Sequence, residues 1–145
     1  SRGLGDVYKR QVYGHLKAAV EELAAALEAR GQKVSVFDLA RDDMAEAVED
    51  AFRYDRLVLA SITYQGEIFP FMSTFIHTLA EHAYQNRTVA LVEAGSWAPT
   101  AAKVMAKELE GMKDITLAQN KVTVLGSLND ASRAQIEVLA DELSK

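Results

Sequence analysis

The chain has no cysteine among its 145 residues, which excludes disulfides, thiolate metal sites and cysteine-ligated iron–sulfur clusters and is compatible with a reducing cytoplasm. It has no excess of basic residues, because 16 Lys and Arg stand against 21 Asp and Glu. The resulting charge of −5 disfavours nucleic acid or an anionic membrane as a partner. No apolar run approaches the ~18 residues of a membrane span. No Pro-, Gly- or Ser-rich linker divides the chain, so we expect one domain.

Helical and strand patterns alternate along the chain. Apolar spacings of three and four predict amphipathic helices, and short apolar runs bounded by turns predict buried strands. Such alternation is typical of an α/β fold with a doubly wound parallel sheet. The expected helices cover about 12–30, 43–52, 69–84, 99–112 and 130–143. The expected strands cover 33–37, 56–61 and 88–93, then 115–117 with 121–125, interrupted near Gln119 and Asn120.

The first eleven residues, SRGLGDVYKRQ, do not fit this pattern. Two glycines and four charged residues break any apolar period, and the segment resembles a translated sequencing-adaptor tail. We therefore interpret 1–11 as a non-native or disordered tail and 12–145 as the domain. The strand expected just before Val12 would then be missing or replaced. The alternative is an ordinary polar N-terminal arm.

The first candidate binding segment opens the expected first helix. It consists of Tyr13, Gly14, His15, Leu16 and Lys17. A helix N-terminus offers unpaired N–H groups and partial positive charge to a phosphate, while a glycine allows close approach. The alternative is a helix-entry turn with a surface lysine.

Two further candidate segments follow expected strands. Thr63, Tyr64, Gln65 and Gly66 follow the strand 56–61, and Gly95, Ser96 and Trp97 follow the strand 88–93. Each combines small polar groups, a glycine and a large aromatic, which suits stacking on a flat ring with backbone contacts to its heteroatoms. In an open parallel sheet, ligands bind at such carboxyl ends of strands. Half-buried aromatic lids on the core are the alternative.

The histidines do not predict a metal site. His77 and His82 are five residues apart on one expected helix and so lie on different faces, and no His-x-x-x-His or Glu-x-x-His spacing occurs. We interpret both as surface residues. No Ser-His-Asp arrangement is visible, so no catalytic residue is assigned.

Taken together, Tyr13-Gly14 before an amphipathic helix, the run Thr63-Tyr64-Gln65-Gly66-Glu67-Ile68-Phe69-Pro70, and Gly95-Ser96-Trp97 after a buried strand resemble the flavodoxin-like domain of flavodiiron proteins (A-type flavoproteins). The resemblance covers 12–145. It implies a five-stranded flavodoxin-like sheet of order 2-1-3-4-5, here with strand 1 missing or replaced, and FMN at the switch point.

Carried over to this chain, the resemblance gives each segment a role. Residues 13–17 would hold the FMN phosphate, 63–66 the isoalloxazine, and 95–97 the other side of the ring. Glu67 and Glu93 are expected near the ring edge, where carboxylates would lower the flavin potential. The family carries a hydroxyl residue where this chain has Leu16, and one before the Tyr-Gly pair that Gln11 replaces.

The resemblance also implies a function and partners. This chain would be the FMN-binding electron-transfer part of an oxygen or nitric oxide reductase. Its partners would be a diiron metallo-β-lactamase-like domain, absent from this sequence, a rubredoxin-like electron donor and a second subunit in a homodimer.

Two alternatives stay open. One is a non-flavin interaction module such as a receiver domain, which shares the architecture and needs acidic residues after strands 1 and 2. A receiver domain also needs a lysine after its fifth strand. Asp38 follows the expected strand 33–37, but Lys121 precedes its strand rather than following it. The other is a truncated fragment that no longer binds FMN.

Overall fold

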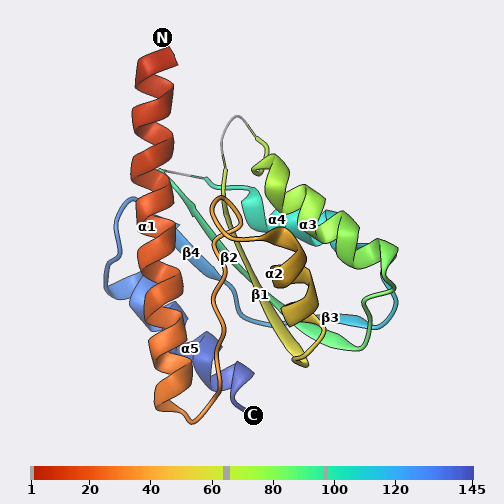
Figure 1. The fold of residues 1–145 in the computed structure, drawn as a ribbon. Coiled ribbons are helices and arrows are strands. Elements are labelled where there is room, and N and C mark those ends of the chain that lie inside the picture. The colour runs from red at the N-terminus through yellow and green to blue at the C-terminus, as the bar shows by residue number, and fades with distance from the viewer. Residues whose placement is uncertain (1, 64–65, 97) are drawn as a thin grey trace.

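The computed structural model describes residues 2–63, 66–96 and 98–145, with side chains described from Tyr13 onward. Its helices are α1 (Arg2–Ala29), α2 (Met44–Ala51), α3 (Pro70–Glu81), α4 (Ala101–Leu109) and α5 (Asp130–Leu143). Its strands are β1 (Arg56–Ile62), β2 (Arg87–Gly95), β3 (Ile115–Leu117) and β4 (Val122–Leu125). Figure 1 shows the sheet between two groups of helices.

All strand pairs are parallel, and β2 is the central strand of the described sheet. β1 pairs along one side of β2 over seven residues. On the other side β3 pairs with Arg87–Val89, and β4 pairs with the later residues Val92–Gly95. β3 and β4 therefore form one interrupted strand, as the sequence predicts. The α/β class and the parallel sheet are confirmed.

Each face of the sheet carries its own apolar core. α1 and α5 cover one face, where Leu23, Val92 and Leu139 are buried together. α2, α3 and α4 cover the other, where Leu59, Ile76 and Met105 are buried. Successive residues of one strand point to opposite faces, so Leu59 packs in the second core and Ile62 in the first. This two-sided burial explains why the strand sequences are almost continuously apolar.

The expected strand 33–37 is wrong. In the structure these residues run outside regular secondary structure, rising beside β1 in the same direction (Figure 1). A strand exists only by pairing, and no described strand lies between this segment and β1. With β3 and β4 counted as one interrupted strand, the described sheet occupies three positions, where the resemblance implies five.

The expected start of the first helix at Val12 is also wrong, because α1 begins at Arg2. No proline interrupts residues 2–12, and Lys9, Arg10 and Gln11 are good helix formers. The backbone therefore continues the helix toward the N-terminus through Gly14, which costs about 1 kcal/mol relative to alanine.

Candidate functional site

The segments that follow β1, β2 and β4 meet at one edge of the sheet, because the three strands are parallel. Hydrogen bonds join these segments directly. The backbone N–H of Gly126, after β4, donates to the carbonyl of Gly95 at 3.0 Å, and that of Thr63 donates to the carbonyl of Ala94 at 3.4 Å. The sequence prediction that the second and third segments are neighbours is thus consistent with the described backbone.

Thr63 connects the second segment to the helix that follows the third. Its Oγ1 accepts hydrogen bonds from the backbone N–H groups of Thr100 at 2.8 Å and Ala101 at 2.7 Å. These groups belong to the N-terminus of α4, whose own N-cap side chain makes no capping bond. A hydroxyl that accepts two bonds still has one hydrogen to donate, so Thr63 can serve the helix and a ligand together.

The two glycines of the predicted ring site occupy their positions for different structural reasons. Gly66 adopts φ of +78° in a turn, and no heavy atom lies within 4 Å of where a Cβ would be. Gly95 is buried, and a Cβ there would lie 3.0 Å from the Cβ of Pro99. Gly66 therefore leaves open space beside an exposed backbone, whereas Gly95 allows the start of α4 to pack on β2.

The predicted aromatic partners of a ring, Tyr64 and Trp97, lie outside the described residues, as does Gln65. Ser96 is described and exposed at the end of β2. The stacking prediction therefore stays a prediction, and the site rests on Thr63, Gly66, Gly95 and Ser96.

The first predicted segment does not form a helix N-terminus. Gly14, His15 and Leu16 lie well inside α1, where backbone N–H groups bond to carbonyls of the preceding turn. Leu16 is 4% exposed in the core between α1 and α5. Lys17 is exposed, with its Nζ 4.0 Å from the Asp38 carboxylate. These residues present one lysine and no free amides.

Tyr13 nevertheless contacts the stretch that follows the second segment. Its ring meets that of Phe69 edge to face, with centroids 5.9 Å apart. Its hydroxyl donates to Oδ1 of Asp38, 25 residues along the chain. Burial, followed by the hydrogen bond to Asp38, raises the pKa of Tyr13 well above its usual value of 10. The first segment therefore lies beside Phe69, three residues after the second segment, and not as a phosphate cradle.

Glu93 is the buried carboxylate of this edge, with 2% of its surface exposed. It accepts from the backbone N–H of Ala102 at 2.9 Å and from the hydroxyl of Thr123 at 2.8 Å, and the Nζ of Lys121 lies 3.3 Å away. Sequence reasoning named Glu93 but missed these partners. They come from α4, β4 and the turn before β4, and no local pattern links them. Glu67, by contrast, is exposed.

The site fits the two ends of a flavin nucleotide unequally. At the ring end, Thr63 has a donor available and Gly66 leaves open space beside its backbone. At the phosphate end, the amides of 14–17 are used by the helix, and the carboxylate of Asp38 lies near Lys17. The described residues therefore suit a flat heterocycle but not the phosphate of FMN.

Among the described residues, no group of three or more histidine, aspartate and glutamate side chains is arranged to hold a metal ion. In the same residues, no helix is both long and apolar enough to cross a membrane.

Comparison with known proteins identifies the fold. No family model matches the chain, and no curated protein matches its sequence. Among solved structures it is similar to rubredoxin oxygen:oxidoreductase from Desulfovibrio gigas, with a TM-score of 0.83 and 17% identity over 90% of this chain and 32% of that one. The flavodiiron core from Synechocystis gives 0.81 and 13% identity over 91% and 32%. Flavodoxin 1 from Bacillus cereus gives 0.76 and 14% identity over 89% and 88%.

These similarities show a flavodoxin-like fold. The chain spans about a third of rubredoxin oxygen:oxidoreductase and of the flavodiiron core, at 32% each, but 88% of the flavodoxin.

Proposed function

We propose that this chain is a flavin-binding electron-transfer domain that holds the isoalloxazine ring at the edge formed by 63–66 and 95–97. The observation that carries the proposal is the junction at this edge, where the hydroxyl of Thr63 binds the N-terminus of α4 beside the open turn at Gly66. The flavodoxin-like fold supports it, because open parallel sheets bind ligands at the carboxyl ends of their strands. A bound flavin supplies the redox chemistry, and the protein supplies binding and orientation.

The proposed roles of Thr63 and Tyr13 follow from the described contacts, and those of Tyr64, Gln65 and Trp97 from the sequence alone. Thr63 orients the ring edge with its remaining hydrogen, and the backbone around Gly66 approaches the ring heteroatoms. Tyr64, Gln65, Ser96 and Trp97 complete the ring site. Residues 13–17 contribute Tyr13 as part of the wall, through Phe69, rather than a phosphate cradle.

The likeness to flavodiiron structures supports further proposals about the physiological context. The chain would operate with a diiron domain of the metallo-β-lactamase type, receive electrons from a rubredoxin-like donor, work as a homodimer and reside in the cytoplasm. The flavodoxin likeness supports the simpler alternative of a stand-alone electron carrier.

The test compares FMN with riboflavin, which carries the same ring without the phosphate. Titration of either flavin, followed by fluorescence quenching, should give dissociation constants within roughly threefold of each other, because the described phosphate end offers no amides. Thr63→Val should weaken both flavins about equally, by roughly tenfold for one lost hydrogen bond of about 1.4 kcal/mol. The matched control Thr116→Val, on exposed β3, should leave both unchanged.

Failure to bind either flavin would refute the proposed function. A preference of a hundredfold or more for FMN would instead show that a phosphate site forms in solution, with the helix starting near Tyr13 as the sequence predicts.

A further inference from the structure

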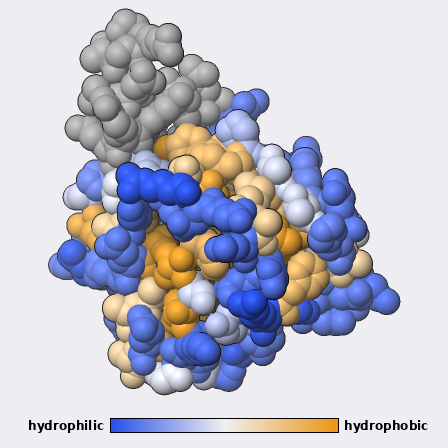
Figure 2. Space-filling view, viewed as in Figure 1, coloured by the Kyte–Doolittle hydropathy of each residue, from blue (hydrophilic) through white to orange (hydrophobic). Residues whose placement is uncertain are grey.

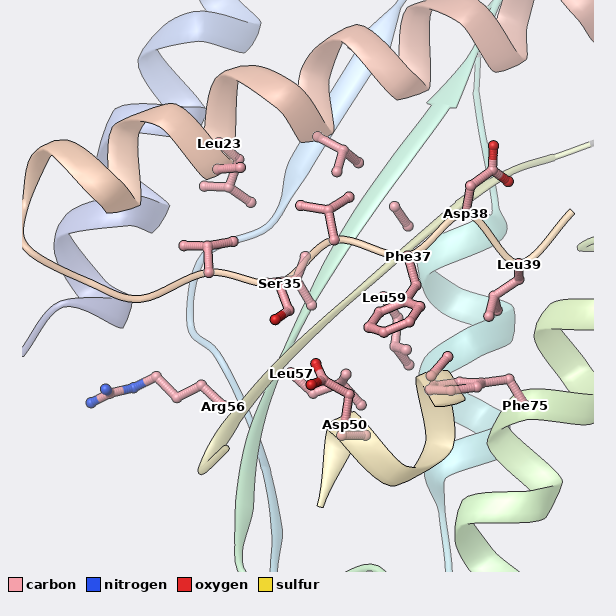
Figure 3. Close-up of a pocket in the computed structure, with 18 of the residues that line it drawn as sticks. Leu23, Ser35, Phe37, Asp38, Leu39, Asp50, Arg56, Leu57, Leu59 and Phe75 are labelled. Carbon is pink, nitrogen blue, oxygen red and sulfur yellow. The ribbon is translucent and has the colours of Figure 1, made fainter. Parts of the chain in front are cut away.

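The two sides of the sheet end differently. Beside β1, a cavity of about 320 Å³ lies between α1, the segment 33–38 and the helices α2 and α3. Figure 3 shows Leu23 of α1 on one side of this cavity and Leu57 and Phe75 on the other. Apolar surface emerges among polar residues on the face that carries the segment (Figure 2). In the flavodoxin-like order this is the place of the strand missing before Val12, so the cavity belongs to the fold and is no separate ligand site.

The opposite side of the sheet ends at an outer edge, which consists of residues 115–125 and contains β3 and β4. The backbone N–H groups of Ala118 and Gly126 donate to carbonyls of β2 at 2.9 and 3.0 Å. Because successive residues of a strand direct these groups to opposite sides, the N–H groups of Leu117 and Leu125 point away from the sheet. Within the described part of the chain, no further strand pairs with this edge.

Two side chains of α5 occupy the middle of the outer edge. Oε1 of Gln135 accepts a hydrogen bond from the outward N–H of Thr123 at 2.7 Å. The carboxylate of Glu142 accepts from the backbone N–H groups of Gln119 at 2.8 Å and Asn120 at 3.0 Å. Gln135 and Glu142 are seven residues apart, which is about two helical turns, so they lie on the same face of α5.

Apolar side chains surround these hydrogen bonds. Val138 lies three residues after Gln135 and four before Glu142, so it shares their face of α5, which packs beside β4 (Figure 1). Four large apolar side chains are exposed among the described residues, and three of them are Leu117 at 42%, Leu125 at 50% and Val138 at 49%. A strand edge that combines open backbone with exposed apolar side chains is prone to pair with another chain.

The bonds from α5 divide the outer edge into short open stretches. Before Gln119, only the three residues of β3 remain open, and after Thr123 only the end of β4 remains. Strand addition gains its affinity from a continuous row of main-chain hydrogen bonds. Stretches as short as these deny a second strand such a row, which is one way in which natural sheets avoid edge-to-edge association.

From these observations we propose that Gln135 and Glu142 block the outer edge against strand addition by a second copy of this chain. Two such edges are self-complementary in antiparallel pairing, since a two-fold axis near residue 121 places Leu117 of one copy opposite Leu125 of the other. The contact is autoinhibitory, because α5 supplies acceptors that a second edge would otherwise supply. The homodimer proposed above would use another surface. The inference does not depend on flavin binding.

The test removes the two acceptors together in the full chain. Gln135→Ala combined with Glu142→Ala should produce a species of twice the mass of the unchanged chain, with a dissociation constant lower by about tenfold or more. Sedimentation velocity over a range of concentrations measures both quantities. Amide hydrogen exchange at Leu117 and Leu125 should slow by about tenfold or more, because their outward N–H groups become bonded.

The matched control exchanges the two side chains. Gln135→Glu combined with Glu142→Gln keeps an acceptor oxygen at each position and the same net charge, so the mass should stay that of the unchanged chain. Glu137→Ala removes a charge from the same helix at a residue that pairs with Arg30 of α1, and it should also leave the mass unchanged. Leu125→Lys, added to the double alanine variant, should restore the original mass, because it places a charge in the proposed interface.

An unchanged mass in the folded double alanine variant would overturn the inference. Doubling that persists after Leu125→Lys would overturn it as well, since the contact would then lie elsewhere, and so would doubling in the exchanged variant. Gln135→Ala alone leaves Glu142 in place and should show the same association more weakly, which keeps the test decisive if the double variant does not fold. The expected doubling in a chain that binds neither flavin would refute only the proposed function.

Discussion

The two sides of the sheet differ in how completely their polar groups are paired. On the β4 side, Glu93 joins β2 to α4 and β4, and Glu142 of α5 accepts from the backbone of Gln119 and Asn120. On the β1 side, the segment 33–37 makes no described backbone bond and a cavity lies beside it. Both sides contain the same apolar residue types. The difference shows that apolar residues are enough to form a core on either side, but the polar groups are satisfied only on the side where hydrogen-bond partners are present.

The largest expected effect comes from core truncation on the two sides. Leu139→Ala removes a fully buried side chain of α5 and should lower the free energy of unfolding by about 2–5 kcal/mol. Val34→Ala, beside the cavity between α1 and β1, should cost less than about 1 kcal/mol, because its side chain already borders that cavity. Urea unfolding of both variants measures the difference. Equal losses would contradict the contrast between the sides.

Removal of the buried Glu93 carboxylate is expected to have the second largest effect on the free energy of unfolding. Glu93→Ala leaves the N–H of Ala102 and the hydroxyl of Thr123 without their acceptor, at a cost of about 1–3 kcal/mol. Glu67→Ala, at an exposed carboxylate, is the control and should change unfolding by less than about 0.5 kcal/mol. Urea unfolding again provides the measurement. If Glu93→Ala leaves the free energy of unfolding unchanged, this carboxylate does not stabilise the β4 side.

On the β1 side, Tyr13→Phe should cost about 1 kcal/mol or less, through loss of the bond to Asp38. The raised pKa of Tyr13 gives the sign of a pH effect. The folded state keeps the phenol protonated, so this stabilisation is complete below pH 10 and is lost as pH rises above it, where the unfolded phenol ionises. Between pH 8 and 11 the free energy of unfolding should therefore fall less steeply in the Tyr13→Phe variant than in the unchanged chain. Identical slopes would exclude the predicted linkage.

The smallest effect is expected at Glu142. Partial burial opposes ionisation, but hydrogen bonds from the backbone of Gln119 and from the side chain and backbone of Asn120 outweigh it and lower the pKa below 4.5. Because the folded pKa is depressed, the stabilisation is present above pH 4.5 and is lost as pH falls through the folded value. Glu142→Gln should make stability less dependent on pH between 5 and 3. An unchanged acid profile would place the acid sensitivity elsewhere.

Local sequence signals predicted much of the fold and part of the site. The runs around Leu59 and Leu91 identified β1 and β2, and the interruption at Gln119 and Asn120 separated β3 from β4. Thr63 and Gly95 were expected at one edge, and the bonds from Thr63 to α4 and from Gly126 to Gly95 are consistent with that. The partners of Glu93 and the Tyr13–Asp38 bond had no local signal, because each joins residues brought together only by folding.

The sequence by itself determined the α/β alternation, the parallel sheet and the two apolar cores, because periodicity and residue type act within a few residues of one another. Tertiary structure alone decided the state of the chain around β1. Lys33 to Phe37 has the composition of a strand, but a strand is defined by a neighbour that only the assembled sheet can provide. Residues 13–17 have the composition of a phosphate loop, but their amides depend on where α1 begins. In both places backbone pairing, which composition does not encode, determines the structure.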